Sequence, residues 1–456
     1  MRRRRRPPGW APRAALALAL GLAGAAARAQ VLVPIIPPVP VPDAEPAPIN
    51  DSDGYTPPPE SAGTSSALSI DGYVDVGFAH AQGDGTSFAP GDTRVPLDYG
   101  VDPFAPAVNA RGDAASTDPG PGRTVNGFLP RSVGIGGRPS FLLNTLDVDL
   151  KYAVPAAPLT VFSRVQFLPR FFEGAEPGDG TRVVVEQAFG RLVPLDSQEL
   201  ALSVGKFDSV FGIEYLDNQA NIRTGVTPSL IARYTTGQSI GAKLFYRIQI
   251  APIWSALSLN LAVTNSGNFV EALQPPDANL TGAPVGSGRL GYELNAPVVQ
   301  AKLGASAMYG PRNDQPERDA HQKAFGADLR VAVAGLYLNA EYVRVTEEPG
   351  GPKTTSQGAF PFASGFSARG GYVQLAWALA IDAGPLRKLT VYARYDRRHA
   401  WFEGFTPITV DRFTGGLRID LWDALILKGE YLDNREVAGA PTVANNVLTS
   451  SLVYSW

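Results

Sequence analysis

The last eleven residues constrain the fold of this chain more than any other stretch. In residues 446–456 (NVLTSSLVYSW), the apolar Leu448, Leu452, Tyr454 and Trp456 recur in step, with the small Ser450 filling the one gap. The intervening residues are mostly small or polar. A period of two is typical of a β-strand whose two faces differ, whereas the ends of most soluble domains fray. We therefore predict that the chain ends within a paired β-strand.

This ending resembles the C-terminal recognition strand of outer-membrane β-barrels. In those proteins the last strand closes the barrel against the first strand and is read by the insertion machinery. The resemblance implies that Tyr454 and Trp456 are the insertion signal, and that the barrel-insertion machinery is a partner. The alternative is an ordinary soluble sheet whose last strand coincides with the end of the chain.

The first residues have the three parts of a secretory signal peptide. Residues 2–6 are arginines, residues 14–27 are apolar, and Ala27-Arg28-Ala29 is a small-x-small cleavage site, so residues 1–29 are the predicted signal peptide, cleaved near Ala29. The apolar run is too short for a membrane-spanning helix, and no later run reaches eighteen apolar residues. The chain has no cysteine, which excludes a disulfide framework.

Charge and proline content constrain the mature chain further. The signal segment holds seven arginines and no acid, so its removal lowers the formal net charge from −3 to −10, which argues against nucleic acid as a partner. Residues 30–67 contain ten prolines and little periodic pattern, which favours extended polyproline II and cannot build a core. We interpret residues 30–67 as a flexible Pro-rich periplasmic leader.

Residues 68–456 contain sixteen segments with period-two character. In residues 145–154, for example, Leu146 and Val148 alternate with Asp147 and Asp149. The connections after even-numbered segments are short, as at residues 155–158, 295–297, 334–335 and 422–424. Those after odd-numbered segments are longer, as at residues 81–140, 208–237, 347–365 and 397–408. This parity is what an up-and-down barrel in a membrane requires.

The sequence therefore predicts an all-β fold, a 16-stranded antiparallel up-and-down transmembrane β-barrel with short periplasmic turns and long extracellular loops. The interior of a barrel of this size is too wide for side chains to fill. We therefore expect the apolar face of each strand to contact outer-membrane lipid and the polar face to border a water-filled lumen.

The central part of the chain resembles a known family. In residues 205–246, a strand that ends in Gly205-Lys206-Phe207 leads through an acidic, Asn-containing loop into a Gly-rich strand. This region resembles the OmpL-like β-barrel porins. The resemblance implies an outer-membrane porin for passive diffusion of small hydrophilic solutes, with homotrimer formation and without cofactor or catalytic residues.

Residues 208–237 are the candidate constriction element, because many sixteen-stranded porins fold their third loop into the lumen. The candidate residues are Asp208, Glu214, Asp217, Arg223 and Arg233. Opposed acids and bases across a narrow lumen would create a transverse field that screens solutes by charge. The alternative is that these charges decorate an extracellular loop.

Ten acids and ten bases are expected on the polar face of the strands, which gives no bulk ion preference, although the net charge favours cations slightly. The candidate lumen-lining residues are Asp71, Asp75, Asp147, Asp149, Lys151, Arg164, Lys243, Arg247, Glu293, Lys302, Asp328, Arg330, Glu341, Arg394, Asp396, Arg412, Arg418, Asp420, Lys428 and Glu430.

Two other functions are compatible with a barrel. A plugged lumen, closed for instance by residues 81–140, would leave a structural or adhesive role. An outer-membrane hydrolase would need a general base beside a nucleophile, or paired carboxylates with different roles. The three histidines, His80, His321 and His399, lie near strand ends or loops without metal-ligand spacing. We therefore predict no enzyme activity, no metal and no cofactor.

Overall fold

The computed structural model describes residues 67–81, 140–155, 157–167, 183–195, 199–250, 254–267, 281–312, 320–349, 353–355, 358–360, 365–402, 407–438 and 446–456. All of them belong to one compact unit, Asp51–Trp456. The predicted signal peptide, nearly all of the Pro-rich leader and nearly all of the loop at residues 81–140 lie outside the described residues. None of the helices among the described residues is long and apolar enough to cross a membrane.

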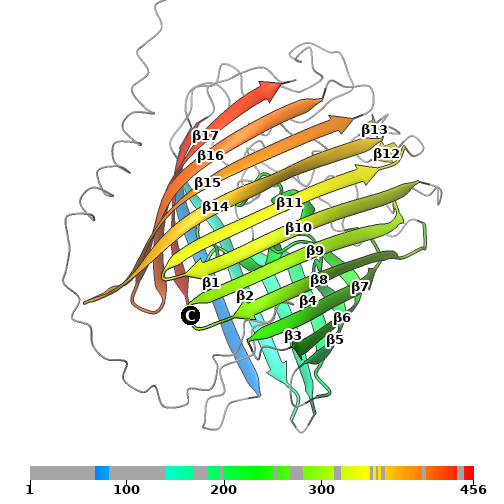
Figure 1. The fold of residues 1–456 in the computed structure, drawn as a ribbon, viewed down its shortest axis with the longest axis horizontal. Coiled ribbons are helices and arrows are strands. Elements are labelled where there is room, and N and C mark those ends of the chain that lie inside the picture. The colour runs from blue at the N-terminus through cyan, green and yellow to red at the C-terminus, as the bar shows by residue number, and fades with distance from the viewer. Residues whose placement is uncertain are drawn as a thin grey trace, which may run out of the picture. The chain divides into compact units, whose positions relative to one another are not determined.

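The described strands form one closed antiparallel barrel (Figure 1). Its sixteen strands are β1 (Leu68–Ala81), β2 (Ser140–Ala153), β3 (Leu159–Phe167), β4 (Val183–Leu192), β5 (Leu200–Asp208), β6 (Gln238–Ile250), β7 (Ser255–Thr264), β8 (Val285–Asn295), β9 (Val299–Pro311), β10 (His321–Val333), β11 (Leu336–Glu347), β14 (Phe366–Ala383), β15 (Leu386–Phe402), β16 (Ile408–Leu421), β17 (Leu425–Ala438) and β18 (Val447–Ser455). Each strand pairs with its neighbour in the barrel sequence, and β1 pairs with β18. The predicted sixteen-stranded antiparallel barrel is confirmed.

The end of the chain closes the barrel. Val74 lies opposite Tyr454, and Phe78 lies opposite Ser450. Beyond the last paired residue of β18, the Trp456 N–H donates to the Gly72 carbonyl at 3.1 Å, and the Gly72 N–H donates to the Trp456 carbonyl at 3.3 Å. The terminal strand predicted from its alternation is therefore the seam of the barrel.

The two faces of the strands differ as the alternation predicts. In β18, Leu448 and Tyr454 are about half exposed on the outer wall, whereas Thr449 and Val453 are buried on the inner face. The same alternation puts Val391 outward and the buried Arg394 inward in β15. Apolar side chains thus form the outer wall, and most charged side chains point inward.

Two of the short connections illustrate the positive backbone φ angles that tight hairpin turns require. Between β10 and β11, Ala334 has a φ of 48° and Gly335 a φ of 82°. Between β14 and β15, Gly384 has a φ of 60°. Such two-residue turns fix the register of each hairpin, and therefore fix which side chains face inward.

Several predicted strand bounds were wrong. Strand β2 begins at Ser140 rather than at residue 145, and β15 continues to Phe402, well past the predicted end at residue 396. The basic run Arg397-Arg398-His399 interrupts the alternation of apolar residues, so the sequence pattern predicted a strand that is too short. The predicted loop at residues 347–365 contains a hairpin of β12 (Lys353–Thr355) and β13 (Gly358–Phe360).

We predict that Gly72→Leu weakens the seam. A Cβ atom at this position would lie 2.4 Å from the Asp147 carbonyl oxygen and 2.5 Å from Cζ2 of Trp456. Overpacking of this kind should lower the free energy of unfolding by about 1–3 kcal/mol, measured by urea unfolding from detergent micelles. The control is Gly415→Leu on β16, where an added Cβ meets nothing within 4 Å. Equal destabilisation by both variants would contradict this account.

Candidate functional site

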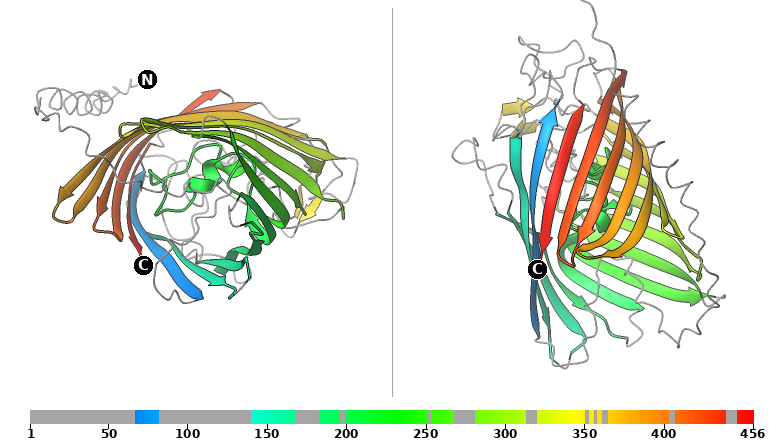
Figure 2. Two further views of the ribbon diagram at one scale, coloured as in Figure 1. Left: turned by 60° about the horizontal axis from the view of Figure 1, so that its bottom comes forward. Right: turned by 90° about the vertical axis from the view of Figure 1, so that its left-hand side faces the viewer.

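A long loop between β5 and β6 lies inside the barrel (Figure 2, left). We call residues 209–237 the lumenal loop. Its base is closed by the Ser209 N–H, which donates to the Gly237 carbonyl at 3.0 Å. The loop contains two 3-10 helices, η2 (Glu214–Asp217) and η3 (Ala232–Tyr234). Most of its residues are buried, which is unusual for a connection between strands.

An apolar cluster anchors both arms of the lumenal loop to the barrel wall. Phe211, Ile231 and Tyr234 are buried together with wall residues that include Val343 and Phe366. Full burial of a large apolar side chain stabilises by roughly 1.5–3 kcal/mol. The inward face of β11 and β14 is therefore partly apolar, because it receives the loop rather than water.

Two wall carboxylates each hold two successive backbone amides of the loop. Glu341 on β11 accepts from the N–H groups of residues 213 and 214 at 3.0 and 3.1 Å. Glu430 on β17 accepts from those of residues 226 and 227 at 2.8 and 2.9 Å. The Tyr392 hydroxyl also donates to Glu430. Charge-assisted bonds of this kind are stronger than neutral ones, so each carboxylate fixes the local backbone.

Wall cations hold the carbonyls of the same loop. Arg394 on β15 donates to the carbonyls of residues 227 and 228 at 2.9 and 2.8 Å. Arg418 on β16 donates to those of residues 221–223 at 3.0 to 3.2 Å. Lys428 on β17 donates to the carbonyls of residues 220, 223 and 225. The barrel wall thus matches acids to loop N–H groups and bases to loop carbonyls.

The structure places the predicted constriction residues in different roles. The Glu214 carboxylate accepts from the N–H and hydroxyl of Ser229, within the loop, and burial raises the pKa of this carboxyl. Arg223 donates to the carbonyls of residues 218 and 226 at 2.8 Å, so it also braces the loop. Asp217 pairs with Arg330 of β10 at 2.7 Å.

Two constriction candidates remain. Asp208 lies at the base of the loop, where its carboxylate accepts from the side-chain amides of Gln187 and Gln238. The side chain of Arg233 lies outside the part of the chain that the structure describes. The four candidates whose side chains are described therefore bond to the wall or within the loop itself.

Seven of the predicted lumen-lining residues contact the lumenal loop. They are Arg330, Glu341, Arg394, Asp396, Arg418, Lys428 and Glu430. Asp396 accepts from the Leu230 N–H at 3.1 Å. The alternation of residues in a strand is the same whether its inward side chains face water or bind the loop. Only the folded structure therefore shows that these residues hold the lumenal loop.

Other predicted lumen-lining residues pair along the wall. Arg164 makes two bonds of 2.7 Å to Asp149, and Asp328 pairs with Arg289 at 2.6 Å. Further contacts join Arg247 and Lys302 to Glu293, Arg412 to Asn434, Asp420 to Arg418 and Lys388, and Asp75 to Asn144 and Ser451. Asp71, Asp147, Lys151 and Lys243 also lie on the inner face. Sequence reasoning missed Arg289, although it alternates with Leu290 in β8.

A cavity of about 220 Å³ remains between the lumenal loop and the wall of β2 to β6. We call it the lateral cavity. Its charged lining residues are Asp149, Lys151, Arg164, Glu186, Arg191, Asp208 and Lys243, all from the wall. Residues 215–222 of the loop contribute Tyr215, Leu216, Asn218, Gln219 and Ile222. This volume is large enough for several water molecules.

The described residues show no metal centre, since none of their His, Asp and Glu side chains form a group of three that could hold an ion. The three histidines lie on separate strands, β1, β10 and β15, as their sequence positions require. His399 shares a hydrogen bond of 2.8 Å with the Thr409 hydroxyl on the outer wall. His321 lies 3.3 Å from the Glu348 carboxylate, and both side chains are partly exposed.

Comparisons with known proteins give only structural likeness. No family model matches the chain, and no curated protein matches it. OmpF of Salmonella typhi in complex with daunomycin is 13% identical, with a TM-score of 0.48, over 85% of this chain and 97% of that one. The outer membrane channel DcaP of Acinetobacter baumannii is 10% identical, with a TM-score of 0.45, over 85% of this chain and 97% of that one. OmpT of Vibrio cholerae is 11% identical, with a TM-score of 0.44, over 86% of this chain and 99% of that one. These values leave the family unassigned.

We predict that Glu430→Ala loosens the lumenal loop. Removal of a buried acceptor costs about 1–3 kcal/mol, so the amides of residues 226 and 227 should exchange with solvent roughly 5- to 150-fold faster. The measurement is hydrogen exchange followed by mass spectrometry. Glu293→Ala is the matched control, because Glu293 is equally buried but contacts Arg247 and Lys302 of the wall. Equal acceleration by both variants would contradict the role of Glu430.

Proposed function

We propose that this chain is an outer-membrane porin that forms a water-filled channel for passive diffusion of small hydrophilic solutes. The observation that carries this proposal is the lumenal loop, which wall charges hold against β10 to β17, together with the polar lateral cavity left along β2 to β6. A closed barrel with a narrowed polar interior is suited to sieve solutes without any chemical step.

The outer wall supports a membrane location. Leucines along the strands, such as Leu202, Leu261 and Leu375, are exposed outward. Exposed aromatic residues lie towards the two ends of the barrel, for example Tyr309 and Phe325 at the long-loop ends, and Tyr454 at the turn end. An apolar band bordered by aromatic residues is typical of a barrel in lipid, and would aggregate in water.

The proposed filter lies on the wall rather than on the loop. Lys151, Arg164, Arg191 and Lys243 face Asp149, Glu186 and Asp208 around the lateral cavity. The facing loop side chains are uncharged. A lining with four cations and three acids favours weak ion selectivity, combined with exclusion by size. Of the candidates expected within residues 208–237, Asp208 lines this cavity.

Other parts of the proposal rest on the sequence. Signal-peptide cleavage near Ala29, the periplasmic leader at residues 30–67, and recognition of Tyr454 and Trp456 by the insertion machinery stay predictions. Membership of the OmpL-like porins and assembly as a homotrimer stay predictions too. Absence of catalysis is also proposed. N-terminal sequencing of the mature protein and native mass spectrometry would test the cleavage site and the trimer.

A plugged barrel with a structural or adhesive role is the second candidate. It is favoured by the number of wall charges that hold the loop and by the small volume of the lateral cavity. The two functions differ in one measurement, because only an open passage carries ions. Stepwise conductance in planar bilayers supports the porin, and silence supports the plug.

We predict that Ile222→Trp narrows the lateral cavity. Ile222 is half exposed and lines the cavity from the loop, so a larger side chain should lower single-channel conductance on the order of twofold. Ile248→Trp on the outer wall is the control and should conduct like the unmodified protein. Unchanged conductance in Ile222→Trp would show that solutes take another path.

We predict that a charge on the outer wall destabilises the barrel in lipid. Leu202→Arg and Ile419→Arg should each lower the free energy of unfolding by roughly 2–4 kcal/mol if the site lies at the bilayer midplane. The measurement is denaturant unfolding from lipid vesicles, with Leu202→Phe as the apolar control. Neutral behaviour of both arginine variants would contradict the membrane location of this wall.

A further inference from the structure

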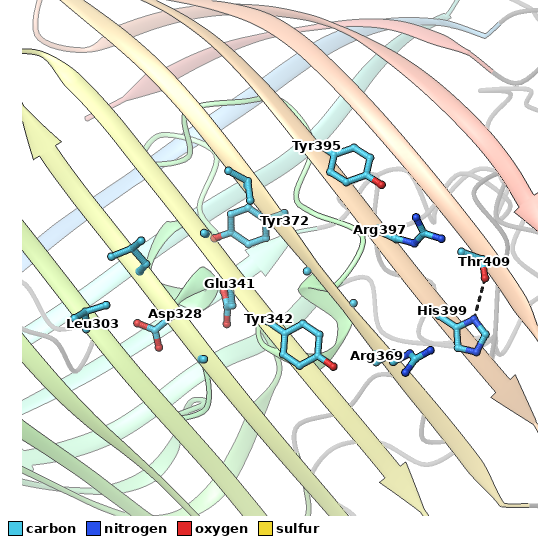
Figure 3. Close-up of a pocket in the computed structure, with 16 residues that line it drawn as sticks. Leu303, Asp328, Glu341, Tyr342, Arg369, Tyr372, Tyr395, Arg397, His399 and Thr409 are labelled. Atoms are coloured by element: carbon cyan, nitrogen blue, oxygen red, sulfur yellow. Dashed lines mark hydrogen bonds between the residues drawn. The ribbon is translucent and has the colours of Figure 1, made fainter.

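The outer wall carries a row of basic side chains near the long-loop ends of three adjacent strands. Arg344 on β11 lies directly opposite Arg369 on β14, and Arg369 lies opposite His399 on β15. Arg397 lies two residues before His399, on the same outward face. Neighbouring strands are about 4.8 Å apart. Figure 3 shows Arg369, Arg397 and His399 gathered at one side of a shared groove.

This basic row lacks enough acid to balance it. Among the described residues, neither Arg344 nor Arg369 forms an ion pair, and Arg397 lies 3.7 Å from the Asp411 carboxylate. Like charges directly opposite each other on paired strands are destabilising, and arginine on a lipid-facing wall is costly away from the interface. An anion held against this row would remove both penalties.

An apolar groove adjoins the basic row. It is open outward, has a volume of about 960 Å³, and is lined by Leu303, Leu329 and Val373 as well as by Arg369, Arg397 and His399. Ala327, Ala340 and Gly371 form the floor of the groove, and their small size leaves the space above them open. Tyr342 and Tyr395 rise beside the floor (Figure 3). Apolar groove and basic row form one continuous surface.

We propose that this surface binds a phosphorylated amphiphile of the outer leaflet, with its phosphate on Arg344, Arg369 and Arg397 and an acyl chain in the groove. Guanidinium groups bind phosphate through paired hydrogen bonds, and clustered arginines beside a membrane select anionic headgroups. The charge of the row and the apolar groove together match a lipid better than a free anion. The inference rests on the membrane location proposed above.

The first test compares two arginines at the same end of the outer wall. Purified protein in micelles is titrated with diphosphoryl lipid A, and bound lipid is counted by native mass spectrometry. Arg369→Gln should weaken binding roughly tenfold. Arg435→Gln on β17 removes the same charge, but Arg435 already pairs with Asp433 at 2.6 Å, so this variant should bind within about twofold of the unmodified protein.

A second variant tests the groove without any change of charge. Ala327 is exposed on the floor of the groove, so Ala327→Phe should fill it and weaken lipid binding on the order of fivefold. Because the added ring lies on the outer wall, the barrel should still fold, which heat-modifiable migration on gels checks. A variant that folds and binds lipid A like the unmodified protein would overturn the role of the groove.

Three further outcomes would overturn the proposal. Equal binding of a dephosphorylated lipid A would show that the site does not recognise phosphate. Full competition by inorganic phosphate would indicate a free-anion site. Dissociation of an oligomer by Ala327→Phe, without loss of lipid, would make this surface an interface between copies. A conductance measurement distinguishes failure of this inference from failure of the proposed channel function. Lipid binding by a barrel that carries no current would contradict only the channel function. Normal conductance without lipid binding would contradict only the proposed lipid site.

Discussion

The interaction on which the interior of this barrel depends is the hydrogen bonding of wall charges to the backbone of the lumenal loop. A buried peptide segment must satisfy its N–H and C=O groups, and this loop lies within the lumen, outside any ladder of strands. Glu341 and Glu430 supply acceptors, while Arg394, Arg418 and Lys428 supply donors. Without these partners, burial of the loop would be unfavourable, and the lateral cavity beside the loop would lose one of its walls.

The arrangement gives two halves of the barrel different contacts with the lumenal loop. Strands β10 to β17 present charges and apolar side chains that receive the loop, whereas β2 to β6 keep their charges around the lateral cavity. In the second half, ion pairs such as Arg164 with Asp149 run along the wall. Their side chains are therefore held in place while still bordering the cavity, as the proposed electrostatic filter requires.

The strand number and the antiparallel pairing could be predicted from sequence, because alternation and the parity of connection lengths are local properties. Closure by the last strand was expected from the resemblance of residues 446–456 to a terminal recognition strand. The hydrogen bonds between wall charges and the backbone of the lumenal loop could not be predicted. Glu341 and the amide of Ile213 that it holds are 128 residues apart, and no spacing rule connects them. The extent of β15 was also missed, because Arg397 and His399 read as a loop when they lie on the outward face of a strand. The bonding partners of the charged wall residues depend on the folded loop, so the strand pattern alone does not indicate them.

The seam between β1 and β18 also governs the order of assembly. Ser451 and Asp75, which share a hydrogen bond across it, are 376 residues apart in the chain. Contacts of such separation form late, because the entropy of closing the intervening segment must first be overcome. Until β18 has paired with both of its neighbours, β1 and β17 are open edges that invite association with other chains. A nascent molecule of this protein therefore needs protection of both edges until the seam has formed.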